Sequence, residues 1–255
     1  MHANERKNKI ISLTNDSQKV EIEELAKNLN VSTMTIRRDL TELENQGHLI
    51  RVHGGAVPVK ELVAEVPYTN KASINLSEKK QIALLALDYI PENGRILMDS
   101  GTTTLEIIRL IKHRRDLTII TNDIKLAMEC IDDPIEIILT GGEMQQGIGA
   151  CTGPVAENFL STIHADLFFL GAHAIHPKAG ITAPTLEKAN IKKKMIEASE
   201  MTVLVADSTK FNLKSFASVC SLNVITYAIT NDNLSDEQLE EYTQSMSMEV
   251  VTKGD

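Results

Sequence analysis

The sequence lacks any apolar run close to the roughly 20 residues that cross a bilayer. Its first residues, MHANERKNKII, contain no apolar stretch of the kind found in secretory signals. Cysteine occurs at Cys130, Cys151 and Cys220 and never as a CxxC pair, which argues against a disulfide framework and a structural zinc site. We therefore expect a cytoplasmic protein with no membrane partner, no metal site and no bound cofactor.

Charge is unevenly distributed along the chain. The 255 residues include 26 Lys and Arg against 35 Asp and Glu, which gives a net charge of -9. Residues 1–60 hold nine basic and eight acidic side chains, so they carry +1 and the rest of the chain carries -10. Such asymmetry predicts two domains with different partners. We expect a first domain over residues 1–57, a linker over 58–76 and a second domain over 77–255.

The first domain has the pattern of a helix-turn-helix. Residues 4–13 predict one helix, and EIEELAKNLN places apolar residues at the i, i+3, i+4, i+7 spacing of a second. Ser32 can cap a third helix that buries one apolar side, formed by Ile36, Leu40 and Leu43. A helix of this kind, polar and basic on its other side, is typical of the element that enters a major groove.

A small hairpin follows the third helix. HLIRVH alternates polar and apolar residues as a half-buried strand does, and Gly54-Gly55 predicts the turn. The first domain is therefore expected to be a winged helix-turn-helix. Its candidate DNA-binding residues are Ser32, Thr33, Thr35, Arg37 and Arg38 on the helix, with Arg51 and His53 on the hairpin. From spacing alone, a generic three-helix domain with a solvated charged face is the alternative.

The second domain alternates strands with helices. Aliphatic runs at 95–99, 117–121, 136–140, 165–171, 201–207 and 223–230 read as strands buried on both faces of a parallel sheet. Helical segments separate them, for example 124–131, 157–163 and 186–198. This order predicts an open α/β sheet, in which ligands bind at the carboxyl ends of strands.

Polar residues follow several of these strands. In DSGTTTLEII, Gly101 permits a tight turn, and three threonines place hydroxyl and N–H groups at a helix N-terminus, which suits a phosphate. A threonine-capped helix without a ligand fits this segment equally well. Thr121-Asn122 and Gly141-Gly142-Glu143 follow the next strands, and Lys210 follows a later one. The run Lys192-Lys193-Lys194 is expected to be a solvated helix face.

Both halves resemble one family. The run VEIEELAKNLNVSTMTIRRDLTELENQGHLIRVHGGAV resembles the N-terminal signature of the DeoR family of bacterial transcriptional regulators. DSGTTT, TN, GGE, the later GIT and EK, and DSTKF resemble the family's C-terminal domain. The resemblance implies that the first domain binds double-stranded operator DNA. It implies that the second is similar in fold to ribose-5-phosphate isomerase and senses a phosphorylated sugar.

The resemblance also assigns effector-binding residues. Asp99, Gly101, Thr102, Thr103 and Thr104 are expected to hold the effector, and Thr121, Asn122, Gly142, Glu187 and Lys210 to complete the pocket. We expect a homo-oligomeric repressor, a dimer or a tetramer, that a sugar phosphate releases from DNA. The alternatives are an activator of the same fold and an aldose–ketose isomerase. For the isomerase Glu143 is the candidate base, although the stretch after it lacks the isomerases' further acidic cluster, so no catalytic residue is expected.

Overall fold

The computed structural model describes residues 3–16, 19–45, 48–52, 54–58 and 72–251. The chain divides into two compact units, Met1–Val66 and Pro67–Asp255, which are described separately. Most of the predicted linker lies outside the described residues. Its last part belongs to the second unit, where the Asn75 side chain donates to Asp207 Oδ1 at 3.1 Å. Within the described residues, no helix combines the length and apolar character needed to cross a membrane.

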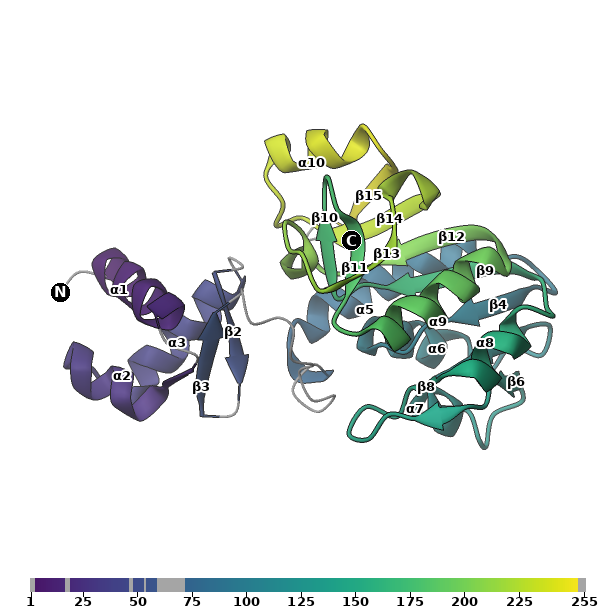
Figure 1. Ribbon diagram of the computed structural model, residues 1–255, viewed down its shortest axis with the longest axis horizontal. Helices are drawn as coiled ribbons and strands as arrows, with labels where there is room; N and C mark the ends of the chain where they lie inside the picture. Colours follow the sequence, from purple (N-terminus) through teal and green to yellow (C-terminus); the bar gives the residue numbers. More distant parts are fainter. Residues whose placement is uncertain (1–2, 17–18, 46–47, 53, 59–71, 252–255) are drawn as a thin grey trace. The chain divides into compact units, whose positions relative to one another are not determined.

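The first unit is a winged helix-turn-helix, as predicted (Figure 1). Its helices are α1 (Ala3–Asp16), α2 (Ile22–Leu29) and α3 (Thr33–Asn45). Asn30 turns the chain between α2 and α3 in the left-handed region, with φ 52°. The strands β1 (Val20–Glu21), β2 (Leu49–Val52) and β3 (Gly55–Pro58) form an antiparallel sheet in the order β1-β3-β2. The two-residue strand β1 gave no sequence signal.

One apolar cluster holds this unit together. Its fully or almost fully buried members are Ile10, Val20, Ile22, Leu25, Ala26, Ile36, Leu40, Leu43, Leu49 and Ala56. They come from all three helices and all three strands, so the orientation of α3 depends on the hairpin as well as on α2. Gly55 allows the close approach of β1, because a Cβ there would lie 1.9 Å from the Val20 carbonyl oxygen.

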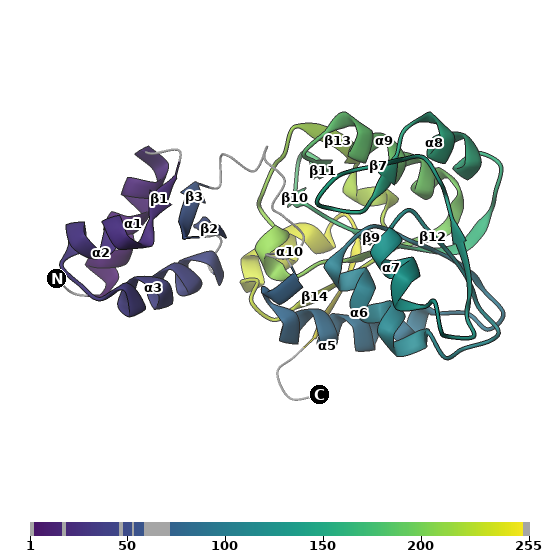
Figure 2. The same ribbon diagram turned by 90° about the horizontal axis from the view of Figure 1, so that it is seen from below.

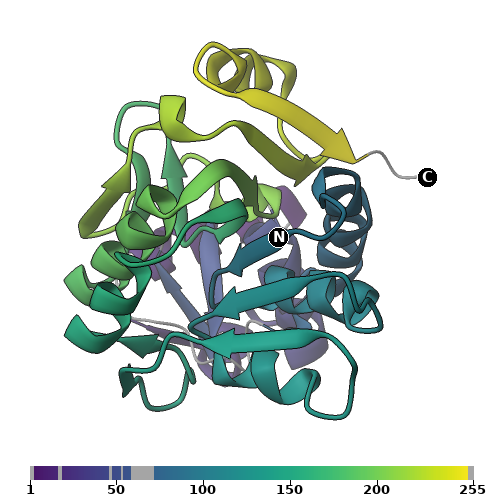
Figure 3. The same ribbon diagram turned by 90° about the vertical axis from the view of Figure 1, so that its right-hand side faces the viewer.

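A seven-stranded parallel sheet forms the centre of the second unit, among the described residues. Its strands are β4 (Arg95–Met98), β5 (Thr118–Thr121), β6 (Glu136–Leu139), β9 (Ala165–Gly171), β12 (Ser199–Val205), β14 (Tyr227–Asn231) and β15 (Ser247–Val251). The spatial order is β15-β14-β12-β9-β4-β5-β6. Figure 3 shows the yellow C-terminal strand at one side of the sheet and the teal strands at the other. The strand order therefore reverses between β4 and β9.

Helices cover both faces of this sheet (Figure 2). Residues of α5 (Leu76–Ala86), α6 (Thr102–Ile111) and α7 (Ile124–Glu129) pack with Ile96 and Met98 of β4. Residues of α8 (Pro154–Leu160), α9 (Leu186–Glu197) and α10 (Asp236–Thr243) pack with Leu97 on the opposite face. Because successive strand residues point to opposite faces, continuous aliphatic runs were the expected signature of this layered sheet.

Smaller elements at the rim gave weaker sequence signals. An antiparallel sheet has the order β10 (Ala174–His176), β11 (Gly180–Ala183), β13 (Ala217–Cys220), and β7 (Glu143–Met144) pairs with β8 (Cys151–Thr152). Short 3-10 helices are η2 (Leu87–Tyr89), η3 (Ser208–Lys210) and η4 (Leu222–Val224). The predicted strand 223–230 is therefore partly wrong, because its first residues form η4 and β14 begins at Tyr227.

Substitutions on the buried and exposed sides of α3 should differ in their effect on the stability of the first unit. Leu40 is fully buried, so Leu40→Ala should lower the stability of this unit by about 2–5 kcal/mol. Met34→Ala on the exposed side of the same helix should change it by less than about 0.5 kcal/mol. Hydrogen exchange of α3 amides in the full chain measures both. Similar exchange in the two variants would show that α3 does not pack as described.

Candidate DNA-binding surface and effector site

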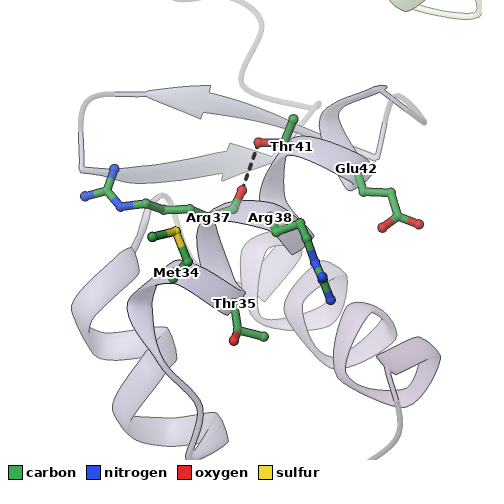
Figure 4. Close-up of a pocket in the computed structure, with 6 residues that line it drawn as sticks. All are labelled: Met34, Thr35, Arg37, Arg38, Thr41 and Glu42. Atoms are coloured by element: carbon green, nitrogen blue, oxygen red, sulfur yellow. Dashed lines mark hydrogen bonds between the residues drawn. The ribbon is translucent and has the colours of Figure 1, made fainter.

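The exposed side of α3 carries the basic residues that the sequence assigned to DNA. Arg37 and Arg38 are both exposed, and no described residue forms a hydrogen bond or ion pair with either guanidinium. Together with Met34, Thr35, Thr41 and Glu42 they line a shallow depression on the helix surface (Figure 4). Both arginines are thus available for phosphate or base contacts.

The hydroxyl groups on this helix also have local roles. Ser32 Oγ accepts the Thr35 N–H at 3.1 Å and lies 2.9 Å from Thr35 Oγ1. Ser32 is therefore the N-cap of α3, as the sequence predicted, and the two hydroxyls are hydrogen-bonded to each other. Thr33 is the first residue of α3 and is exposed.

The hairpin residue Arg51 contacts α3. Its Nη1 donates to Thr41 Oγ1 at 2.8 Å, and its backbone N–H donates to Glu44 Oε1 at 2.9 Å. Arg51 Nε is buried and has no hydrogen-bond partner among the described residues. Arg51 therefore fixes the hairpin to the recognition helix. The other predicted hairpin contact, His53, lies outside the described residues.

Ion pairs also fix α3 to the first helix. Arg6 Nε donates to Asp39 Oδ2 at 2.5 Å and Arg6 Nη2 to Asp39 Oδ1 at 3.1 Å, and both side chains are buried. The hydrogen bonds to Asp39 raise the pKa of Arg6 against the opposing effect of burial. Lys7 pairs with Glu42 on the next turn. These contacts set the angle at which the basic side of α3 is presented.

In the second unit, a buried ion pair lies where the strand order reverses. Asp99 follows β4, accepts the Gly171 N–H of β9 at 3.0 Å, and pairs with the Lys192 ammonium from α9. Lys192 Nζ also donates to the Gly171 carbonyl oxygen at 2.8 Å. Burial raises the pKa of Asp99, and Lys192 together with the Gly171 N–H opposes that rise. Open α/β sheets bind ligands at this kind of reversal point.

The expectation that Lys192 belongs to a solvated face is wrong. Lys192 is only 7% exposed, whereas Lys193 is exposed. The signal was present in the helical spacing, because position 192 shares a side of α9 with the buried Ala189 and Met195. Lys188 lies one turn earlier and is half-buried. Burial, with a smaller effect of Lys192, lowers its pKa to about 7.

The threonine segment forms the first turn of α6. Gly101 is its N-cap, and Thr102 is half-buried at the first position. Thr103 is buried, and Thr104 donates its hydroxyl to the carbonyl oxygens of Asp99 at 2.8 Å and Gly101 at 2.9 Å. Thr104 therefore stabilises the strand-to-helix turn. Thr102 is the least enclosed of the three hydroxyls.

The end of the neighbouring strand β5 adds a second polar group. Thr121 is fully buried and donates to the Met98 carbonyl oxygen at 2.8 Å, which ties β5 to β4. Asn122 donates from Nδ2 to the Cys151 carbonyl oxygen at 2.9 Å. Its Oδ1 is buried and has no hydrogen-bond partner among the described residues. A buried acceptor without a donor is costly, so Asn122 Oδ1 marks a position suited to a ligand hydroxyl.

Asp123 links the ends of β4 and β5. Ser100 Oγ donates to Asp123 Oδ2 at 2.9 Å, and the Lys125 N–H donates to Asp123 Oδ1 at 2.8 Å. Burial raises the pKa of Asp123, and these two donors oppose the rise. The Asp99–Gly171 contact, the Ser100–Asp123 contact and Asn122 therefore occupy the ends of β9, β4 and β5, which are adjacent strands.

Lys210 belongs to a cluster at the end of β12. It lowers the pKa of the buried Asp207, although burial opposes the change. Lys79 of α5 is buried, acts on the same carboxylate and donates to the Ile74 carbonyl oxygen at 2.6 Å. Lys79 belongs to no motif of the sequence. Its position beside Ile82 and Ala83 on the buried side of α5 is the signal that could have found it.

Three other predicted or alternative site residues have different surroundings. Glu187 is exposed in the first turn of α9, where its own backbone N–H and the Thr185 hydroxyl lower its pKa. Gly142 has φ +107°, and a Cβ there would lie 2.5 Å from the Thr152 carbonyl oxygen, so its close approach is to β8. Glu143, the candidate base of the isomerase alternative, is exposed on β7.

Comparison with known families matches both units. The model of the DeoR-like helix-turn-helix domain matches residues 6–61. The model of the DeoR C terminal sensor domain matches residues 74–232.

Curated relatives extend over almost the whole chain. An HTH-type transcriptional regulator GlpR of Haloferax volcanii is 38% identical over 93% of this chain and 93% of its own. A putative aga operon transcriptional repressor of Escherichia coli O157:H7 is 31% identical over 98% of this chain and 94% of its own. Transcriptional repressor AccR of Agrobacterium fabrum is 32% identical over 89% of each chain. These relatives are named as regulators of transcription and not as enzymes.

Similar solved structures include ribose 5-phosphate isomerases. Ribose 5 phosphate isomerase A from Neisseria gonorrhoeae shares 18% identity over 52% of each chain, with a TM-score of 0.38. The corresponding isomerase of Methanocaldococcus jannaschii shares 15% identity over 54% of this chain and 55% of its own, with a TM-score of 0.40.

Lys188 predicts a pH dependence of stability. Its pKa falls from the ordinary 10.5 to about 7, so the folded protein favours the neutral amine. Between pH 7 and 10.5 the unfolded chain binds the extra proton, and the stability of the folded state rises with pH through this range. Below pH 7 both states are protonated and the full cost of burying the charge applies.

Lys188→Met should remove this dependence. The melting temperature of Lys188→Met should be higher than that of the parent protein. The difference should be largest near pH 6.5 and should shrink toward pH 10. Lys193→Met, an exposed neighbour on the same helix, is the matched control and should follow the parent at every pH. Parallel curves for the parent and Lys188→Met would contradict the lowered pKa.

Proposed function

This chain belongs to the DeoR family of transcriptional regulators, and from that premise we propose that it represses a carbohydrate-catabolism operon until a phosphorylated sugar binds its sensor domain. The buried Lys192–Asp99 pair at the reversal point of the sheet is the observation that carries the effector half of the proposal. The repressor half is supported by relatives whose names include the word repressor.

DNA binding is assigned to the exposed side of α3. Arg37 and Arg38 project from it without partners among the described residues, while Ser32, Thr33 and Thr35 stand at its N-terminal end. In a helix-turn-helix this end contacts base edges. Because residues 1–60 carry only +1 in total, contact with DNA is assigned to this basic side. Affinity should fall as salt rises, with a slope set by the number of phosphates that its basic side chains contact.

The effector pocket is assigned to the ends of β4, β5 and β9. A phosphate is attracted by the Lys192 ammonium and by the N–H groups at the start of α6, where Thr102 adds a hydroxyl. A sugar hydroxyl can donate to Asn122 Oδ1. Asp99 positions Lys192, and Thr104 and Thr121 hold the backbone around the pocket.

The switch requires a difference in affinity. A ligand releases the repressor only if it binds the DNA-free arrangement more tightly than the DNA-bound one. An operator with symmetric half-sites further implies a homo-oligomer, as a dimer or a tetramer. We place the protein in the cytoplasm, where its proposed DNA target lies. The cysteines Cys130, Cys151 and Cys220 are free thiols, which suits a reducing compartment.

Removing one recognition-helix charge tests the DNA-binding surface. Arg37→Ala should weaken binding to a duplex selected from a random pool by about 1–3 kcal/mol, as for loss of a bidentate base contact. Arg115→Ala removes the same charge from an exposed position of the sensor domain and should leave affinity unchanged. Fluorescence anisotropy with a labelled duplex measures both. Equal affinities for the parent and Arg37→Ala would remove Arg37 from the surface.

Removing the buried ammonium tests the effector pocket. A panel of sugar phosphates is first screened for thermal stabilisation, since a pocket ligand stabilises by mass action. The stabilising compound should release the parent protein from the duplex. Thr102→Val should bind the duplex normally and lose at least about tenfold in effector sensitivity. Lys192→Met should lose at least as much, and because it also leaves Asp99 buried without its partner, its folding is checked by circular dichroism. Lys193→Met should respond as the parent does.

The same titration separates the alternatives. Tighter duplex binding with the sugar phosphate would indicate an activator. Interconversion of an aldose and a ketose phosphate that Glu143→Gln abolishes would indicate an isomerase. Normal release of Lys192→Met and Thr102→Val from the duplex would place the effector elsewhere.

A further inference from the structure

Met34 is an apolar side chain in an unusual position. It is 76% exposed, the highest value among the large apolar side chains of the described residues. It is the second residue of α3 and has no place in the apolar cluster of its unit. An isolated exposed apolar residue is common on protein surfaces, so exposure alone assigns nothing.

Met34 lies on the same side of α3 as one of the exposed arginines. Figure 4 shows Met34 and Arg37 projecting to the same side of α3, with Arg38 and Glu42 on the other side. The thioether thus lines one side of the depression, in the first turn of the helix. Polar contacts within the depression do not involve it.

The groups that base pairs present in the major groove limit what an apolar side chain can recognise there. In the major groove, guanidinium groups suit guanine edges and phosphates, whereas the C5-methyl group of thymine is the apolar feature presented there. The first turn of a recognition helix is the part that reaches base edges. A methionine is unbranched and flexible, so it can follow a methyl group without a strict geometry.

We propose that Met34 is a specificity-determining residue that packs against a thymine methyl group in the operator. The proposal rests on the proposed DNA binding by α3, and it names one base that this helix recognises. Arg37 supplies the charged contact beside it, and Met34 selects a T·A pair by excluding water from the methyl group. If this contact is lost, binding loses the free energy gained by burying about one methyl group of the DNA and part of the Met34 side chain.

Substituting deoxyuridine for thymine tests the contact, because it removes only the methyl group. The full chain is used to select a duplex from a random pool, and each thymine of that duplex is replaced singly by deoxyuridine. For the parent protein, one position in each half-site should lose about two- to fivefold in affinity. Met34→Ala should bind the thymine duplex more weakly and show no further loss at that position. Met34→Leu should keep most of the discrimination.

Two controls make the result specific. Met128→Ala changes a comparably exposed methionine on α7 of the sensor domain and should reproduce the parent at every position. Met34→Gln keeps the length of the side chain but replaces the apolar end, and should lose the discrimination. Because Met34 is exposed, these variants should fold as the parent does, which circular dichroism checks.

The outcomes separate this proposal from the broader one. If the parent binds no selected duplex, DNA binding by α3 fails. If the parent binds a duplex tightly but deoxyuridine has no effect at any position, DNA binding stands and the Met34 contact is wrong. The contact is equally wrong if Met34→Ala keeps the full deoxyuridine penalty, because the methyl group is then read by another side chain.

Discussion

The sensor domain depends on one constraint, the burial of a charged pair where the strand order of its sheet reverses. Asp99 and Lys192 are both almost inaccessible, and each also contacts the Gly171 backbone. Burying two charges is favourable only when they are paired and hydrogen-bonded, so this contact fixes β4, β9 and α9 relative to one another. Asp99 also lies just before α6, which begins at Thr102. The same contact thus ties the two halves of the sheet together and lies at the position that we propose for the effector.

The DNA-binding unit separates packing from recognition on a single helix. One side of α3 buries Ile36, Leu40 and Leu43, and the other leaves Arg37 and Arg38 without partners among the described residues. Contacts around the rim set the helix orientation, from α1 through the buried Arg6–Asp39 pair and from the hairpin through Arg51. Recognition residues can therefore differ between regulators while the packing side keeps the helix in place.

The fold could be predicted from the sequence because its signals are local. Periodicity placed the helices of the first unit, Ser32 marked the start of α3, and aliphatic runs marked most strands of the parallel sheet. Contacts between distant segments could not be read in the same way. Lys192 was expected on a solvated helix face because its partner Asp99 is 93 residues away in sequence. Met34 carries no sequence signal of its own, because its exposure depends on how α3 packs in the folded unit.

The proposed switch requires thermodynamic linkage between DNA binding and effector binding, and one pair of titrations measures it. The sugar phosphate that stabilises the sensor domain is titrated into the protein with and without saturating duplex, and the duplex is titrated with and without saturating sugar phosphate. The account predicts that each ligand weakens the other by the same factor, between about 5 and 150. A sugar phosphate that binds equally well to the free protein and to the protein–duplex complex would contradict it.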